Sequence, residues 1–263
     1  MAWFSGQHDE VAGEEARLGI ERASHFYDAR QDVARRTSRS AQPISLQVSW
    51  KTVMQRVGEY LDARRSSAPL FLYVNLVDTH FPYWHSELDD IVGVRSFSRS
   101  EIRPENRDRV LHAYENAAAN VDRAIGELLS RADRALGVST IVVVTGDHGQ
   151  SFYENRTLGH GQALDDAQTR VPLVVRGAGP EVPPLLALSD LRGAIGAWVD
   201  GAAPRASEGP VLQWVGEVSR ARRIGLRTPA RATSVDLHAP PGTDAAREAI
   251  RAWEMARYLE AEK

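Results

Sequence analysis

Two short segments of the sequence carry side chains that can bind a metal ion or move a proton. Asp147 and His148 follow the apolar run at residues 140–145, and His160 follows later between two glycines. A carboxylate beside a neutral imidazole suits a divalent ion such as zinc, manganese or calcium. The pattern therefore predicts a metal site with Asp147 and His148 as ligands and His160 as a catalytic neighbour.

An ion held by Asp147 and His148 would act on an ester in two ways. It would lower the pKa of a bound water or alcohol, and it would neutralise the charge that develops on the ester oxygen. His160 would contact a substrate oxygen, protonate the leaving group or hold a second ion. Because a catalytic zinc commonly takes three protein ligands, these two would form only part of the site.

The residues before these side chains predict the elements that position them. The apolar, β-branched run at 140–145 is typical of a strand covered on both faces, and the run at 69–77 has the same character. Parallel sheets place their chemistry at the carboxyl ends of the strands. His80 follows the second run as His148 follows the first, which predicts a second catalytic residue. A structural role for His80 is the alternative.

Two amphipathic helices are expected between these strands, at residues 49–64 and 107–135, the first capped by Ser49. The order strand, long helix, strand predicts a βαβ unit with parallel strands. Apolar side chains three and four residues apart define the inner faces. These side chains are Val53, Met54, Val57, Tyr60 and Leu61 in the first helix, and Leu111, Tyr114, Ala118, Val121, Ile125 and Leu128 in the second.

The C-terminal part of the chain alternates short strands and helices. We expect an edge strand at 170–175, helices at 189–199 and 210–220, antiparallel strands at 224–226 and 233–237, and a last helix from residue 244, with Ala246, Ile250, Trp253 and Ala256 inside. The sequence thus predicts an α/β fold with a largely parallel sheet flanked by helices. Its expected domains are a catalytic domain at 1–201 and an α+β extension at 202–263 packed on it.

Composition limits the classes of function. The 263 residues are enough for a sizeable core. The formal net charge of −3 gives no field that would recruit nucleic acid. The absence of cysteine excludes disulfides and thiolate metal sites within this sequence. No apolar run approaches the roughly 20 residues of a membrane helix, and the first residues do not resemble a signal peptide.

The motifs, taken together, resemble a known family. In order they are Asn-Leu-Val-Asp-Thr-His-Phe-Pro-Tyr at 75–83, Thr-Gly-Asp-His-Gly at 145–149, Gly-His-Gly at 159–161 and Arg-Val-Pro-Leu at 170–173. This series is similar to the sulfatase family of the alkaline phosphatase superfamily. The resemblance covers roughly residues 1 to 200, and it implies an alkaline-phosphatase-like fold.

The resemblance also implies roles for individual residues. Asp147 and His148 would be ligands of a divalent metal, zinc, manganese or calcium. His80 and His160 would contact the sulfate or phosphate group or hold a second metal. The substrate would be a sulfate or phosphate ester of a small molecule, a glycan or a lipid. Family members are often found in the cell envelope or periplasm, whereas this sequence leaves localisation and oligomeric state open.

Members of the family also carry an N-terminal strand with acidic metal ligands, followed by a nucleophile that is a formylglycine, serine or threonine. This sequence shows no counterpart of either, and without cysteine it has no formylglycine. We therefore expect a sulfatase-like, metal-dependent hydrolase that is incomplete at its N-terminus, and the sequence leaves open whether an upstream segment supplies the nucleophile and the remaining ligands. The alternatives are a phosphoethanolamine-transferase-like enzyme of the same fold and a non-catalytic remnant.

Overall fold

The structure is a computed structural model, and it describes the chain in seven stretches. These are residues 1–9, 19–37, 45–177, 181–206, 210–217, 220–238 and 242–261, the last with side chains only to residue 255. The chain forms two compact units, Met1–Val138 and Ser139–Lys263, which are described separately. The domain division predicted at residue 201 stays a prediction. The side chain of Ala256, predicted to face inward, lies outside the described part.

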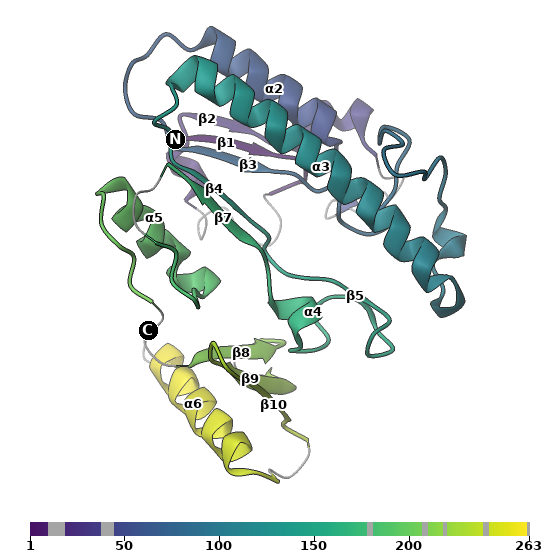
Figure 1. The fold of residues 1–263 in the computed structure, drawn as a ribbon, viewed down its shortest axis with the longest axis vertical. Helices are drawn as coiled ribbons and strands as arrows, with labels where there is room; N and C mark the ends of the chain where they lie inside the picture. Colours follow the sequence, from purple (N-terminus) through teal and green to yellow (C-terminus); the bar gives the residue numbers. More distant parts are fainter. Residues whose placement is uncertain are drawn as a thin grey trace. The chain divides into compact units, whose positions relative to one another are not determined.

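The first unit is built on a three-stranded parallel sheet (Figure 1). Its central strand, β1 at Ala2–Ser5, lies between β2 at His25–Tyr27 and β3 at Leu72–Asn75, and both neighbours run parallel to it. All four residues of β1 are buried, as a strand with helices or loops on both faces must be. Phe4 belongs to the main hydrophobic core together with Val53 from the following helix.

Two long helices, α2 at Trp50–Ala63 and α3 at Arg107–Leu136, pack against each other beside this sheet (Figure 1). Both lie close to their predicted positions. Four of the five side chains predicted to face inward from α2 are buried, and Tyr60 is packed against the core. Short 3-10 helices complete the unit at Ile20–Arg22, Ala29–Arg35, Arg99–Glu101 and Pro104–Asn106.

The inner face of α3 differs from the predicted one. The predicted stripe is only half-buried, and the fully buried residues lie beside it. They include two asparagines, Asn116 and Asn120, whose side-chain oxygens accept the backbone N–H groups of Asp89, Ile91 and Val92. A hydrophobic pattern does not count asparagine as an inner-face residue, so it placed the face about one residue out of register. The buried residues of α3 are Val110, Ala113, Asn116, Ala117, Asn120, Ala124 and Ala132.

The cap of α2 also differs from the prediction. Ser49 occupies the N-cap position, but its hydroxyl donates to Glu87 and makes no capping hydrogen bond. The buried carboxylate of Asp78 takes this role, because both of its oxygens lie 3.0 Å from the backbone nitrogen of Trp50. The Nε2 atom of His85 lies 3.0 Å from the same carboxylate. The loop that follows β3 is thus anchored on the first turn of α2.

The second unit contains the strand of the Asp-His-Gly motif. This strand, β4 at Val142–Thr145, pairs antiparallel with β7 at Leu173–Arg176. The prediction that it is covered on both faces is wrong, since Val142 to Val144 are half-buried and Val174 opposite is 60% exposed. Beyond β4 come the hairpin strands β5 at Ser151–Phe152 and β6 at Leu158–Gly159, then the single-turn helix α4 at Asp166–Thr169.

The C-terminal α+β region of this unit is an antiparallel sheet with a helix on it. Strands β9 at Arg223–Arg227 and β10 at Ala232–Asp236 confirm the predicted pair, and α6 at Asp244–Ala261 confirms the last helix. The predicted helix at 210–220 is wrong, because Val211–Val215 forms strand β8 and pairs with β9. The remaining helical elements, at Leu188–Asp190 and α5 at Leu191–Val199, match the predicted helix.

A partly buried ion pair in the first unit predicts how stability depends on pH. The Asp32 carboxylate, 10% exposed, accepts hydrogen bonds from Arg56 Nε and Nη2, each at 2.8 Å, and from the Tyr27 hydroxyl. These bonds, above all those from Arg56, hold the pKa of Asp32 below its usual value. A depressed carboxyl pKa stabilises the fold above the unfolded pKa, and this stability is lost as the pH falls through the folded pKa.

We expect Asp32→Asn to lower the free energy of unfolding at pH 7 by about 1 to 2 kcal/mol, because charge-assisted hydrogen bonds are lost. Chemical denaturation from pH 7 to pH 2 should show the difference from the unmodified chain shrinking below pH of about 4. Glu59→Gln is the matched control, since Glu59 also bonds Arg56 but is exposed. An equal loss in both variants would contradict the prediction.

Candidate functional site

The Asp-His-Gly motif lies directly beyond the end of β4. Gly146 follows the last strand residue, and the exposed carboxylate of Asp147 comes next, with 89% of its side chain accessible. The backbone N–H of His148 donates to Asp147 Oδ1 at 3.0 Å. The His148 side chain is 35% exposed. The predicted ligand pair therefore lies at a strand end and is open to solvent.

The imidazole of His148 has a defined tautomer in its neutral form. Its Nδ1 atom lies 2.9 Å from the carbonyl oxygen of Gly149. A carbonyl oxygen only accepts, so Nδ1 carries the proton and Nε2 carries the lone pair. Nε2 lies 3.6 Å from Asp147 Oδ2. A carboxylate oxygen and an imidazole lone pair, the two donors predicted for a metal, are thus adjacent.

His160 lies against this pair. Its ring stacks on that of His148, with the ring centres 3.5 Å apart and the planes inclined by 25°. Its Nδ1 atom lies 3.0 Å from the side-chain oxygen of Gln150, which leaves the proton on Nδ1 and the lone pair on Nε2 in the neutral ring. The structure therefore brings together three of the four predicted site residues, Asp147, His148 and His160.

Gly149 is required by a close approach to α4. A Cβ atom at this position would lie 2.1 Å from the carbonyl oxygen of Ala167, a distance that no side chain allows. The Gly149 N–H donates to the backbone oxygen of Gln168 at 2.9 Å. The glycine that ends the motif thus holds the loop after His148 against α4, independently of any chemistry.

Gln168 is a site residue that sequence reasoning missed. Its side chain is 3% exposed, and its Oε1 atom accepts the backbone N–H groups of Gln162 and Ala163, each at 3.0 Å. Its Nε2 atom donates to the buried hydroxyl of Ser151 at 2.8 Å. One amide therefore ties the loop of His160 to strand β5. A glutamine in a polar stretch carries no signal of such a role, because its partners are two backbone N–H groups and a serine hydroxyl, none of which forms a recognisable motif with it.

His80 belongs to the first unit and lies beyond the end of β3, as predicted. Its side chain is exposed, and its Nδ1 atom lies 3.0 Å from the carbonyl oxygen of Phe81 and 3.2 Å from the side-chain nitrogen of Gln47. The Phe81 carbonyl requires a proton on Nδ1, whereas the Gln47 amide nitrogen requires a lone pair there, so these two contacts leave the tautomer of His80 open. Gln47, which is 9% exposed, was not predicted from the sequence. The catalytic role of His80 stays a prediction.

The geometry of Asp147 and His148 can be compared with that of a metal site. Two ligands of one tetrahedral ion, at bond lengths of about 2.1 Å, lie about 3.4 Å apart. The 3.6 Å between Asp147 Oδ2 and His148 Nε2 is close to this value. Within the described residues, however, no group of three or more His, Cys, Asp or Glu side chains is placed to hold a metal ion. The pair fits two ligands of an ion, and metal binding stays a prediction.

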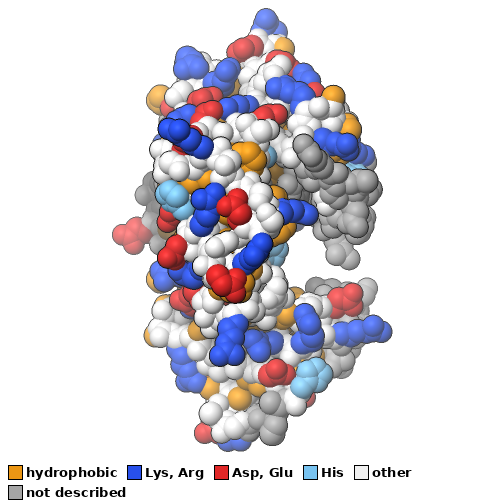
Figure 2. Space-filling model, turned by 90° about the vertical axis from the view of Figure 1, so that its right-hand side faces the viewer, with side chains coloured by type: hydrophobic (Ala, Val, Ile, Leu, Met, Phe, Trp, Pro, Cys, Tyr) orange, Lys and Arg blue, Asp and Glu red, His pale blue; other side chains and the backbone are white. Residues whose placement is uncertain are grey.

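The face of the molecule drawn in Figure 2 is mixed in charge. Figure 2 shows Lys and Arg side chains interspersed with Asp and Glu on the face drawn, in keeping with a net charge of −3. No helix in the described part of the chain has the length and hydropathy that crossing a membrane requires.

Known proteins share this sequence pattern and fold. The family model described as Sulfatase matches residues 3–192. A solved 2-O GAG sulfatase is similar at a TM-score of 0.55 and 14% identity, over 99% of this chain and 70% of that one. A protein of the alkaline phosphatase superfamily from Vibrio parahaemolyticus is similar at a TM-score of 0.51 and 14% identity, over 97% of this chain and 65% of that protein's chain. A search among curated protein sequences gives no match.

A third structure, the lipoteichoic acid synthase LtaP from Listeria monocytogenes, has a TM-score of 0.48 at 15% identity, over 69% of this chain. This chain spans 44% of that structure's length. At such identities the likenesses show the fold alone. The two structures with TM-scores of 0.55 and 0.51 confirm the predicted α/β, alkaline-phosphatase-like architecture.

The contacts of Gln168 predict what holds the His160 loop. Replacing Gln168 with Ala leaves the Ser151 hydroxyl and two backbone N–H groups without their present partner, so we expect a loss of about 2 to 3 kcal/mol in the free energy of unfolding. Limited proteolysis should cleave the loop at 159–163 faster than in the unmodified chain. Gln162→Ala, at an exposed position in the same loop, is the control and should change neither quantity. Equal cleavage in all three proteins would disprove the role of Gln168.

Proposed function

This chain belongs to the sulfatase family, and we propose that it is a metal-dependent hydrolase of sulfate or phosphate esters. The observation that carries the proposal is the pairing of Asp147 Oδ2 and His148 Nε2 at 3.6 Å with His160 stacked on the same imidazole. Two donors for one ion and a third titratable ring at a strand end form an arrangement suited to ester cleavage.

In this proposal Asp147 and His148 hold a divalent ion, zinc, manganese or calcium. When bound, the ion supplies positive charge that stabilises a negatively charged ester oxygen and lowers the pKa of a bound alcohol or water. The Nδ1–H bond to Gly149 orients the His148 ring and keeps its Nε2 lone pair directed beside the carboxylate. The adjacent backbone therefore sets the ligand geometry.

His160 and His80 are proposed to contact the sulfate or phosphate group. In the neutral His160 ring Nδ1 donates to the side-chain oxygen of Gln150, which leaves the lone pair on Nε2. Such a nitrogen takes a proton from an attacking group, and once protonated it donates one to a leaving oxygen. The Gln168 contacts hold the loop of the first ring, and Asp78 anchors the loop of the second.

The substrate is proposed to be a sulfate or phosphate ester carried by a small molecule, a glycan or a lipid. A sugar sulfate is supported by the fold shared with the 2-O GAG sulfatase, although at 14% identity the likeness concerns the fold. The catalytic domain is proposed at 1–201, with 202–263 as an extension on it. The chain spans 44% to 70% of the length of the similar structures, and the activity stays a proposal.

Metal binding provides a direct test of the ligand pair. Titration calorimetry with zinc, manganese and calcium should show one of them binding, with an affinity at least about tenfold lower in Asp147→Ala and in His148→Ala, since each removes one of few ligands. The same ion should raise the melting temperature of the unmodified chain by mass action. His238→Ala, at an exposed histidine on another element, is the control. Unchanged binding in both ligand variants would refute the site.

Turnover tests the histidines. Hydrolysis of nitrophenyl sulfate and nitrophenyl phosphate should require the ion, and we expect His160→Ala to reduce kcat by about 10²- to 10⁴-fold, the usual contribution of a general acid or base. His238→Ala should leave kcat unchanged. Metal binding without turnover of either ester would contradict the hydrolase proposal and favour a binding protein of the same fold. Turnover that persists after chelation would contradict metal dependence.

A further inference from the structure

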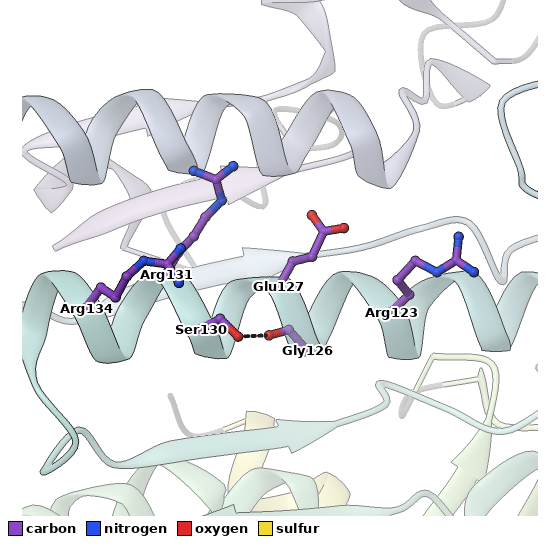
Figure 3. A pocket seen from close by; sticks show the side chains of 6 residues that line it. All are labelled: Arg123, Gly126, Glu127, Ser130, Arg131 and Arg134. Carbon is purple, nitrogen blue, oxygen red and sulfur yellow. Dashed lines mark hydrogen bonds between the residues drawn. The ribbon is translucent and has the colours of Figure 1, made fainter.

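Two adjoining hollows lie on the helices of the first unit, and both are lined by arginines. One, of about 480 Å³, runs along α3 (Figure 3), and the other, of about 280 Å³, lies where the C-terminal turns of α2 and α3 meet. Arg131 and Arg134 line both. The first is lined by Arg123, Gly126, Glu127, Ser130, Arg131 and Arg134, and the second by Leu61, Asp62, Arg64, Arg131, Arg134 and Ala135.

These hollows carry an excess of positive charge. Each is lined by three arginines and one carboxylate. Arg123 is paired with Asp89 at 2.7 Å. For Arg131 and Arg134, by contrast, the described part of the chain provides no carboxylate within ion-pair distance. Arg131 is also half-buried, so its guanidinium has lost some water without gaining a counter-charge.

Two glycines inside the helices shape this region, Gly58 by making room for Arg131 and Gly126 by leaving the larger hollow open. A Cβ atom at Gly58 of α2 would lie 2.7 Å from Arg131 Nη1, so the guanidinium occupies the space that a side chain would fill. Gly126 of α3 lines the larger hollow, and a Cβ there would meet no atom within 4 Å. A glycine inside a helix destabilises the helix relative to alanine. No packing contact requires it at Gly126, and its effect is a deeper hollow.

A purely structural role explains only part of this arrangement. Arg134 lies in the last turn of α3, where a cation interacts favourably with the helix dipole. That effect fades within one turn. It therefore does not account for the position of Arg131, for the missing counter-charge or for Gly126.

We propose that these hollows bind the sulfate or phosphate groups of a ligand that carries at least two such groups. Guanidinium groups fit these oxyanions through paired N–H donors. Arg131 and Arg134, one helical turn apart, provide adjacent donors for two groups, and Arg64 extends the positive surface of the smaller hollow. The site is distinct from the proposed ester-cleaving residues and does not depend on their activity.

The test is calorimetric titration of the full chain with sodium tripolyphosphate and, separately, with a trisulfated disaccharide. We expect the double variant Arg131→Gln, Arg134→Gln to bind at least about tenfold more weakly, since each lost charged hydrogen bond contributes about 1.5 kcal/mol or more. Arg103→Gln, at an exposed arginine outside the hollows, is the control. If the chain binds just one of the two probes, that probe identifies the preferred group as phosphate or sulfate. If the double variant binds both probes as tightly as the unmodified chain, the proposal is overturned.

A second pair of variants separates binding from folding. Gly126→Ala should raise the melting temperature by about 2 to 4 °C, because alanine has the higher helix propensity. The same substitution should lower the affinity for the probe, because the added methyl group narrows the hollow. Glu127→Gln should raise the affinity for the probe, since it removes from the lining a negative charge that repels the anionic probe. Opposite or absent effects in both variants would overturn the proposal. His148→Ala should leave probe binding intact, which separates this site from the proposed catalytic one.

Discussion

The candidate site depends on the close approach of Gly149 to helix α4. Because a Cβ atom would lie 2.1 Å from the Ala167 oxygen, only glycine brings the two segments together. That contact places the Gly149 carbonyl beside His148 Nδ1 and sets the tautomer of the predicted ligand. It also brings α4, and with it Gln168, to the loop that carries His160. A single steric constraint thus positions both imidazoles.

The same principle applies at the end of β3. There a buried carboxylate, Asp78, accepts the first free N–H of α2 and so fixes the loop on which His80 lies. In both units an interior polar side chain satisfies backbone groups that a loop or a helix end leaves without partners. The histidines themselves stay exposed. Rigid supports and accessible rings together suit residues that must meet a ligand from solvent.

Sequence reasoning identified the parts of this structure that have a local signal. The spacing of apolar residues predicted helices α2 and α3. The polar residues that follow the apolar run at 140–145 pointed to Asp147 and His148. It failed where the signal lies in tertiary contacts. Asn116 was excluded from an inner face because its backbone partners lie 24 and 25 residues away. Gln168 was missed although its backbone partners lie only five and six residues away, because a polar side chain that bonds backbone groups leaves no periodic pattern. The strand β8 was predicted as a helix because its pairing with β9 is not local.

The exposure of Asp147 bears on how an ion would bind. A buried, unpaired carboxylate would destabilise the ion-free fold, whereas a side chain that is 89% exposed keeps its hydration and carries no such penalty. Binding must then displace water from both ligands. The geometry is nevertheless partly prepared, because the His148 N–H already bonds Asp147 Oδ1 and Gly149 orients the ring. The fold therefore lowers the entropic cost of binding by orienting the ligands rather than by burying them, so affinity should depend strongly on any further ligand that joins the pair.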